Sequence, residues 1–556
     1  MNAPEHPPLA QRFLTHAVTN QPPLLGDYDA YATDLPLREA LAREGGGWAA
    51  REVAAYGVLA GGELMGLGVL ANENKPKFRP FDRYGNRIDE VEYHPAYHGL
   101  MRTALAHGVP GFAWHHADRP GAHVAHAALH YLHTQAEQGT MCPLAMAYAC
   151  VPVLRRQPEL AGWLARALST EYDPRPLPGW DKRANLIGMA MTEKQGGSDV
   201  RANATRAHAA GTGPDGALFE LVGHKYFVSA PMCDAFLMLA YAGDGLTCFL
   251  VPRFAPGGAL NGLHIQRLKD KLGDWSNASS EMELAGALAW QVGAAGRGIA
   301  TILEMVALTR LDVMLGSAAI MRQALVQALH HARHRKAFGK LLVDQPLMRN
   351  VLADLALESE SATALAFRVS RAVDAGNRDP AEGAFARIAT AIGKYWLCKR
   401  CPPFVNEAQE CLGGLGYVEE SSLARLYRQA PLNSIWEGSG NVQCLDVLRA
   451  LSREPATREA LFFELAAARG EHPALDAEAA RLQREPDTPA DLETRSRWLV
   501  ERMALALQAS ILLRAGNRAV ADAFCESRLG GAHGLAFGTL PPQAPMDALL
   551  ARAFPA

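Results

Sequence analysis

The sequence of 556 residues contains no apolar run of the roughly 20 residues that a transmembrane helix needs. Its N-terminus lacks the basic start and apolar core of a secretory signal, so we expect a cytoplasmic protein with no membrane partner. The net charge of −3 excludes a globally basic nucleic-acid binder, although not a local basic face. At 49% apolar and 20% charged residues, the chain is globular and too long for one hydrophobic core.

Metal-binding patterns are also sparse. Cys398-Lys-Arg-Cys401 has a metal-like spacing, but a second pair is missing and a zinc site needs about four ligands. His94 with His98, and His126 with His130, are spaced by four residues without the Glu of a His-Glu-x-x-His motif. We therefore expect reduced cysteines, histidines in surface or packing roles, and no metal.

Helical periodicity dominates the first third of the chain, as in Leu35–Ala60 and Val124–Leu154. Lys75–Pro95 breaks this pattern and predicts a loop or short hairpin. Between Ala184 and about Leu288 the segments are short, β-branched or aromatic, and separated by Gly-rich turns. About seven strands at this spacing favour a small antiparallel sandwich or barrel.

The helical period returns at Gly298 and predicts an antiparallel bundle. Beyond Arg453 the chain is rich in Pro, Glu and Arg and ends in an amphipathic helix at about Leu492–Ala515. The fold class that follows is α+β, mostly α, with an N-terminal helical domain (1–183), a central β domain (184–290), a helical bundle (291–450) and a C-terminal helical appendage (451–556). The expected bundle helices are Ile299–Arg335, Gln345–Ala375, Ala381–Lys399, Pro403–Cys411 and Asn441–Ser452.

A candidate for chemistry is the turn Asn433-Ser-Ile-Trp-Glu-Gly-Ser-Gly-Asn441. Its lone acid, Glu437, has apolar neighbours, which raise the pKa of a carboxyl group and so suit a general base. The glycines let the backbone approach a flat ligand, and Ser439 offers a hydroxyl group. Taken alone, this stretch is more typical of an ordinary helix-to-helix turn with a solvated Glu.

Five stretches in order resemble the acyl-CoA dehydrogenase family. Met191-Thr-Glu-Lys-Gln-Gly-Gly-Ser-Asp199 resembles its flavin-binding loop, with Lys194 and Gly197 replacing the usual Pro and Ala. Gly223-His-Lys-Tyr-Phe-Val-Ser229 resembles the strand that lies against the flavin. Arg335-Lys-Ala-Phe-Gly339 resembles the element that reaches a neighbouring subunit's cofactor, which implies at least a dimer and, from the family, a homotetramer. Leu412-Gly-Gly-Leu-Gly-Tyr417 and Trp436-Glu-Gly-Ser439 complete the series.

The resemblance implies FAD as the cofactor and α,β-dehydrogenation of an acyl-CoA as the reaction. Glu437 would take the α-proton while the flavin accepts the β-hydride. The base position of some branched-chain members falls on Thr309, which cannot serve, and Glu410 replaces a common Gln at the adenine end. The residues implied to contact FAD are Met191, Thr192, Gly196, Gly197, Ser198, Phe227, Val228, Ser229, Arg335, Phe338, Glu410, Gly413, Gly414, Trp436, Ser439 and Asn441.

The resemblance extends over nearly the whole chain to one branch of the family, whose members bind double-stranded DNA through a C-terminal helical domain and are linked to defence against alkylating agents. From residue 450 onward this chain has twelve Arg, no Lys and fourteen Asp plus Glu, so the appendage is not basic overall. Local clusters could still neutralise DNA phosphates, although a solvated mixed-charge surface is the alternative. The candidate phosphate contacts are Arg449, Arg495, Arg502, Arg514 and Arg518.

Two functions stay open at this point. The first is an FAD protein of the alkylation response that binds double-stranded DNA, protects it or inactivates alkylating agents, and has at most weak dehydrogenase activity. The second is a metabolic acyl-CoA dehydrogenase with a structural C-terminal extension. We favour the first, because the resemblance includes both appendages.

Overall fold

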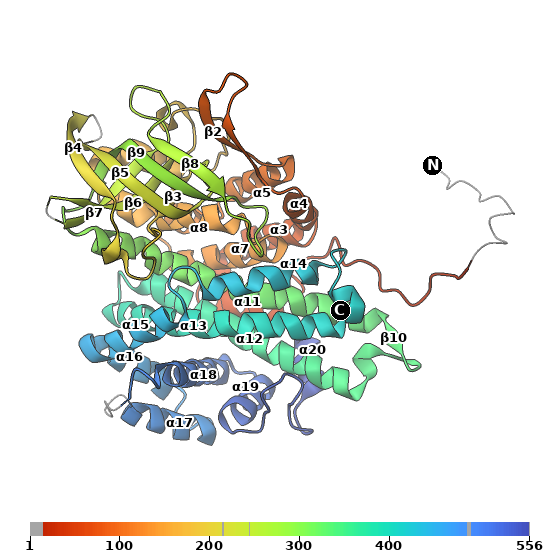
Figure 1. Ribbon diagram of the computed structural model, residues 1–556. Helices are drawn as coiled ribbons and strands as arrows, with labels where there is room; N and C mark the ends of the chain where they lie inside the picture. Colours follow the sequence, from red (N-terminus) through yellow and green to blue (C-terminus); the bar gives the residue numbers. More distant parts are fainter. Residues whose placement is uncertain (1–14, 214–215, 244, 486–490, 555–556) are drawn as a thin grey trace.

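The protein is described by a computed structural model that covers residues 15–213, 216–243, 245–485 and 491–554. The β-rich segment lies at one end of the molecule with the N-terminal helices beside it (Figure 1). The long bundle helices cross the middle, and the C-terminal helices form the opposite end. The predicted mostly helical α+β fold class is confirmed.

The N-terminal region is a set of short helices interrupted by one hairpin, which confirms the loop or hairpin predicted at Lys75–Pro95. In the described residues no single helix is long and apolar enough to cross a membrane, but the pair Gly47–Gly61 and Glu63–Glu73, bent by 48°, passes by length and composition. The elements are α2 (Leu35–Arg43), α3 (Ala50–Gly61), α4 (Glu63–Glu73), β1 (Lys77–Phe81), β2 (Arg87–Glu92), α5 (Pro95–Ala106), α6 (Phe112–His115), α7 (Ala122–Ala136), α8 (Met141–Ala149), α9 (Val151–Arg155) and α10 (Ala161–Ala167).

The central strands form one seven-stranded sheet in the order β3-β6-β4-β5-β9-β7, with β8 paired to β9. Because β6 also pairs with β7, the sheet closes into a barrel. Most strand pairs are antiparallel, as predicted, but β6 runs parallel to both β3 and β4; parallel neighbours need a crossover, which β5 supplies between β4 and β6. The strands are β3 (Ile187–Ala190), β4 (Arg206–Gly213), β5 (Gly216–Ser229), β6 (Ala235–Ala242), β7 (Gly245–Pro252), β8 (Leu263–Leu268) and β9 (Ser279–Val292).

The bundle is built around α11 (Gly298–His334), which is buried along most of its length between α7, α12 (Pro346–Ala375) and α13 (Pro380–Cys411). The predicted break between Ala381–Lys399 and Pro403–Cys411 is wrong: α13 continues through Pro402 and Pro403. A proline removes one helical hydrogen bond, but the buried Cys401, Phe404 and Val405 keep this segment against the core. The other bundle helices are α14 (Ser422–Gln429) and α15 (Gly440–Arg453).

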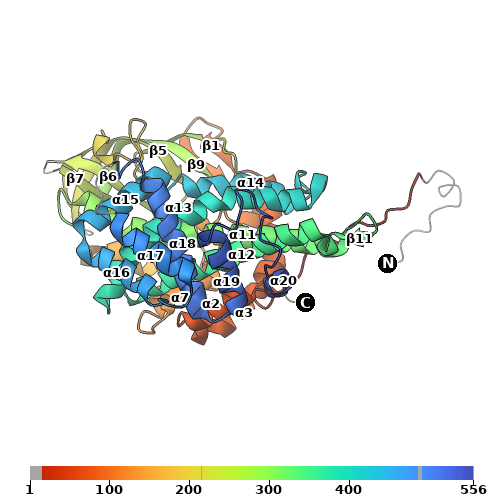
Figure 2. The same cartoon turned by 90° about the horizontal axis from the view of Figure 1, so that it is seen from below.

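Beyond α11 the chain forms a small hairpin of β10 (Lys336–Ala337) and β11 (Lys340–Leu341), which projects from the molecule at the side away from the barrel (Figures 1 and 2). The last region packs on α12 and α13 through the deeply buried α18 (Ser496–Ala515), which confirms the predicted C-terminal helix. Around it lie α16 (Pro455–Ala466), α17 (Pro473–Arg484), α19 (Arg518–Phe524) and α20 (Met546–Ala553).

One buried arginine joins both ends of the chain to the bundle. Arg322 of α11 forms an ion pair with Asp34, 3.1 Å from Nε to Oδ2, and donates hydrogen bonds to the carbonyl groups of Thr33 and Ala553. The N-terminal helices, α11 and α20 therefore meet at a single cation. The boundaries between the four predicted domains stay a prediction.

Candidate active site

The turn that carries Glu437 has a constrained backbone. Glu437 has a φ of 56°, in the left-handed region that side chains rarely adopt and that often marks a functional site. Gly438 follows with a φ of 92°, and a Cβ atom there would approach Gln443 Nε2 to 2.7 Å. Glycine is therefore needed at this position, as the sequence suggested.

Side chains from three helices hold the carbonyl groups of this turn. Lys394 of α13 donates from Nζ to the carbonyl oxygens of Trp436, at 2.7 Å, and Gly438. Arg310 of α11 and Gln443 of α15 both donate to the carbonyl oxygen of Glu437, at 3.0 and 3.1 Å. The position of the Glu437 carboxylate is thus fixed from all sides by the bundle.

The carboxylate itself has one hydrogen-bond partner among the described residues. Thr309 Oγ1 lies 2.9 Å from Glu437 Oε2 and 3.1 Å from the carbonyl oxygen of Val306. Burial raises the pKa of Glu437, against this hydrogen bond and the charges of Lys394 and Arg310. Oε1 stays available, so the group has the environment expected of a general base.

Cys142, at the start of α8, connects this turn to the barrel. Burial raises the pKa of its thiol to about 11, against a side-chain hydrogen bond from Ser229 and with a further contribution from the charge of Glu437. The end of β5 and the Glu437 turn therefore face each other across Cys142. Nothing in the sequence pattern singles out this cysteine, because it opens an apolar helix.

A buried ion pair shapes the loop Met191–Asp199. Glu193 is fully buried, lies 2.8 Å from Lys225 Nζ of β5, and accepts a hydrogen bond of 2.6 Å from Thr205. Against the effect of burial, Lys225 and Thr205 lower the pKa of Glu193 to about 2. The loop is therefore anchored to the barrel by an acid and a lysine that both lie in the motifs, although neither was predicted to be a site residue.

Three family models match this chain in succession. They are the adaptive response protein AidB N-terminal domain at residues 20–174, the acyl-CoA dehydrogenase middle domain at 188–287 and the acyl-CoA dehydrogenase C-terminal domain at 296–452. The AidB protein of Escherichia coli (strain K12) is 45% identical over 518 residues, which span 93% of this chain and 94% of that protein. The chain belongs to the acyl-CoA dehydrogenase family.

Two solved structures share the family's fold. ACDH-11 of Caenorhabditis elegans, in complex with C11-CoA, has a TM-score of 0.82 and 24% sequence identity, covering 98% of this chain and 94% of that chain. A glutaryl-CoA dehydrogenase of Mycobacterium smegmatis, in complex with FADH2, has a TM-score of 0.54 and 21% identity, covering 64% of this chain and 86% of that chain. The first extends over both appendages and the second over the shared core.

FAD is the cofactor of this family, and the loop after β3 has the donors that the flavin needs. The Thr192 hydroxyl and the amides of Gly197 and Ser198 donate no hydrogen bond to any described residue. A Cβ at Gly197 would approach Thr192 Cγ2 to 3.3 Å, so glycine keeps this part of the loop uncovered. Uncovered amides suit a pyrophosphate and a free hydroxyl suits the pyrimidine edge of a flavin.

Only some side chains of the strand predicted to cover the flavin are accessible at the surface of the barrel. Phe227 is 50% exposed and Ser229 is half-buried, whereas Val228 is 0% exposed in the barrel core. Successive side chains of a strand point to opposite faces, so Val228 offers the cofactor its backbone alone. Phe227 provides an accessible apolar face of the kind that a flavin ring covers.

The remaining predicted cofactor residues fall into two groups. Trp436, Ser439 and Asn441 lie in or next to the Glu437 turn, and Ser439 is the N-cap residue of α15. Arg335 follows α11 and donates to the carbonyl oxygen of Asn20 at 2.5 Å, and Phe338 is fully exposed at the tip of the hairpin. Glu410, Gly413 and Gly414 are also exposed, at the end of α13 and just beyond it.

The hairpin that carries Phe338 lies well away from the barrel in both views (Figures 1 and 2). One chain therefore does not bring Arg335 and Phe338 to the loop Met191–Asp199. That these two residues serve the cofactor of another subunit stays a prediction.

The predicted phosphate contacts of the C-terminal region are ion-paired within it, with Arg449 as the exception. Arg495 pairs with Glu485, Arg514 with the buried Glu464, Arg502 with Glu478 at 2.8 Å, and Arg518 with Glu471 at 3.2 Å. Arg449 of α15 is exposed, and it has no ion pair with any described residue. Of the five predicted phosphate contacts, Arg449 is therefore the one without an ion pair to a described residue, whereas the other four are ion-paired within their own region.

Proposed function

We propose that this protein is an FAD-containing, AidB-type protein of the adaptive response to DNA alkylation, which acts in the cytoplasm, binds double-stranded DNA and retains a dehydrogenase-type proton-abstracting centre. The observation that carries the chemical part is the buried Glu437 carboxylate, held by Thr309 and fixed by three helices. The observation that supports the DNA part is the 45% identity with AidB over 93% of the chain, which includes C-terminal residues beyond the dehydrogenase core.

In the chemical step, bound FAD supplies a hydride acceptor. Glu437 removes the α-proton of an acyl thioester onto Oε1, the oxygen that Thr309 does not occupy. The raised pKa of Glu437 makes it a stronger base than an exposed carboxylate, and the charges of Lys394 and Arg310 oppose that rise. C11-CoA bound to ACDH-11 makes a fatty acyl-CoA the first ligand class to try.

Thr309 serves both protonation states of the base. Its single hydroxyl hydrogen donates to Glu437 Oε2 before proton transfer. After the transfer the proton lies on Oε1, and Oε2 remains an acceptor to which the Thr309 hydroxyl can keep donating, with the Val306 carbonyl oxygen 3.1 Å from the same hydroxyl. Thr309 is therefore a positioning residue for the base.

The first experiment tests the base. We expect anaerobic mixing of the FAD-loaded protein with a series of acyl-CoA esters to bleach the flavin, weakly or strongly according to chain length. Glu437→Gln should lower this rate by about 10²–10⁴-fold, the usual contribution of a general base, while the yellow FAD-bound protein persists. Glu420→Gln, which alters an exposed acid, is the matched control. A wild-type rate in Glu437→Gln would show that another group takes the proton.

The second experiment tests the DNA part. A mobility shift on a short duplex at about 50 and 200 mM salt should show binding that weakens steeply with salt. If no complex forms at the lower salt while an acyl-CoA bleaches the flavin rapidly, the protein is a metabolic acyl-CoA dehydrogenase with a structural extension.

Oligomerisation is part of the same proposal. The fully exposed Phe338 and the nearby Arg335 are placed to reach a second copy of the chain, and the family resemblance implies a homotetramer. Sedimentation of Phe338→Ala with a parallel measurement of FAD content checks this point, since loss of the contact should lower both the assembly state and the retained FAD.

A further inference from the structure

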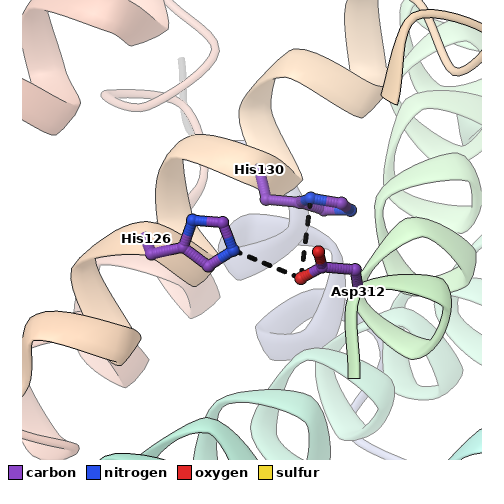
Figure 3. Close-up of side chains that lie close together, drawn as sticks. All are labelled: His126, His130 and Asp312. Carbon is purple, nitrogen blue, oxygen red and sulfur yellow. Dashed lines mark hydrogen bonds and ion pairs between the residues drawn. The ribbon is translucent and has the colours of Figure 1, made fainter. Parts of the chain in front are cut away.

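Two histidines and an aspartate meet in the core, away from the Glu437 turn. His126 and His130 lie four residues apart on one face of α7, and Asp312 faces them from α11 (Figure 3). His126 Nε2 is 3.2 Å, and His130 Nδ1 3.7 Å, from the same Asp312 oxygen, Oδ1. All three side chains are at most 3% exposed.

In this cluster two acceptor atoms face each other, and two further polar atoms have no hydrogen-bond partner among the described residues. His126 Nδ1 lies 2.8 Å from the Val109 carbonyl oxygen, which only accepts, so Nδ1 carries the hydrogen. In the neutral ring, Nε2 then directs its lone pair at a carboxylate oxygen. His130 Nδ1 and Asp312 Oδ2 are buried and have no hydrogen-bond partner in the described part of the chain. Buried polar atoms without partners are costly, so something further satisfies them.

Protonation of His126 would make only one of these contacts favourable. It would turn the His126–Asp312 contact into an ion pair but leave His130 Nδ1 unsatisfied. A cation between the three side chains would satisfy both nitrogens and Asp312 Oδ1 together, and a water molecule bound to that cation could donate to Oδ2. We propose that His126, His130 and Asp312 bind a zinc ion that joins α7 to α11.

The distances fit this ion. Tetrahedral zinc with bonds of about 2.0–2.1 Å keeps its ligand atoms about 3.3–3.4 Å apart, and the two nitrogen-to-oxygen distances are 3.2 and 3.7 Å. Among the described residues, no other set of three or more His, Cys, Asp or Glu side chains brings its ligand atoms within 4.8 Å of one another. A fourth position remains for a water molecule, as in other three-ligand zinc sites.

The surroundings also fit. The hydrogen bond from His126 Nδ1 to the Val109 carbonyl is the outer contact that metal-bound histidines commonly make. Tyr148 stacks on the His126 ring at 3.7 Å between centroids, which fixes the ring plane.

The location gives such an ion a structural role. Asp312 lies one helical turn after Thr309 on α11, and the ion would hold that part of α11 against α7. It would therefore support the helix segment that positions the Glu437 carboxylate, without contacting the base.

The test uses the full-length, FAD-loaded protein, stripped with a chelator, exposed to zinc and freed of excess by gel filtration. Wild type should retain about one zinc ion per chain by atomic emission, and zinc should raise its melting temperature. His130→Leu should lower affinity by more than about 100-fold, since outer-contact changes alone cost 10–100-fold. His334→Gln, an exposed histidine on the same helix as Asp312, is the control for surface binding.

His130→Leu removes no hydrogen bond at Nδ1, so the zinc-free variant should fold and melt like zinc-free wild type. Should it fail to fold, Asp312→Asn replaces it, because the amide keeps the shape and removes the charged ligand. Equal zinc retention by wild type and either variant, or none by wild type, overturns the proposal.

Discussion

The Glu437 turn and the C-terminal helices use charged side chains in opposite ways. In the turn, Lys394 donates to backbone carbonyl groups, Arg310 contacts both the Glu437 carbonyl group and Asp446, and Glu437 keeps one carboxylate oxygen without a hydrogen bond to any described residue. In the C-terminal helices, arginines such as Arg502 and Arg514 are matched to carboxylates of the same region.

The difference separates residues kept for a ligand from residues used for stability. An ionisable group without a full set of partners costs free energy, and a chain keeps it only where another molecule supplies the missing contact. By this criterion the buried Glu437 carboxylate is the group expected to meet a ligand, and four of the predicted phosphate contacts have partners in their own region. Arg449 differs from these four because it is exposed and has no ion pair with any described residue.

The largest expected effect concerns a buried arginine of the C-terminal region. Arg528 pairs with Glu358 at 3.0 Å and with Asp354, and both acids lie on α12. Arg528→Met should lower the free energy of unfolding by up to about 3–5 kcal/mol, because it removes the cation that these two buried carboxylates share and leaves each with one partner, Arg400 for Glu358 and His533 for Asp354. Denaturant unfolding measures this loss, and Arg484→Met, at an exposed arginine, should cost nearly nothing.

The same network predicts a pH dependence. Against the effect of burial, His533 and Arg528 lower the pKa of Asp354 to about 2. A lowered pKa stabilises the fold fully above the ordinary value of about 4, and this contribution is lost as the pH falls toward 2. Arg528→Met should show a smaller loss over that interval. An equal loss in both proteins would mean that Asp354 does not depend on Arg528.

An intermediate effect is expected at the turn. The Thr309 hydrogen bond lowers the pKa of Glu437, so Thr309→Val should raise that pKa. The base acts when ionised, so flavin reduction rises with pH, and the rise should shift upward in the variant. Thr301→Val, in the exposed first part of α11, is the control. An unshifted profile would remove Thr309 from its positioning role.

The smallest expected effect tests whether Arg449 contacts DNA or, like the ion-paired arginines, only stabilises the fold. Arg449→Ala should reduce the slope of log affinity against log salt for duplex DNA by about 0.9, the value for one phosphate contact. Arg502→Ala should leave the slope unchanged and lower stability instead, since Arg502 is held by Glu478. The reverse pattern would move the DNA-binding surface onto α18.

Much of this could be read from the sequence because it depends on local pattern. Helical period located α11 and α18, and the Gly-rich turn with an acid between apolar neighbours indicated the base before any contact was known. The choice of two glycines and a serine after Glu437 is explained by local backbone conformation, for example by the positive φ of Gly438.

The rest depends on contacts between distant residues. Lys394 lies in the interior of α13, where a lysine is normally solvated, and only the fold places it under the turn. The pairing of Arg514 with Glu464 joins residues 50 positions apart, so charge counting along the chain could not show that the arginine is already used. The continuity of α13 through Pro402 likewise depends on burial rather than propensity.

Helix α11 carries Thr309, Asp312 and Arg322 on one continuous rod and ends beside Arg335. Each residue of an α-helix turns the next by about 100°, so a single insertion after Asp312 would rotate Arg322 and Arg335 away from their partners while leaving Thr309 in place. Substitutions in this helix can be absorbed locally, but a change in its length cannot. Homologous chains should therefore vary in residue type along α11 and keep its residue count constant between these positions.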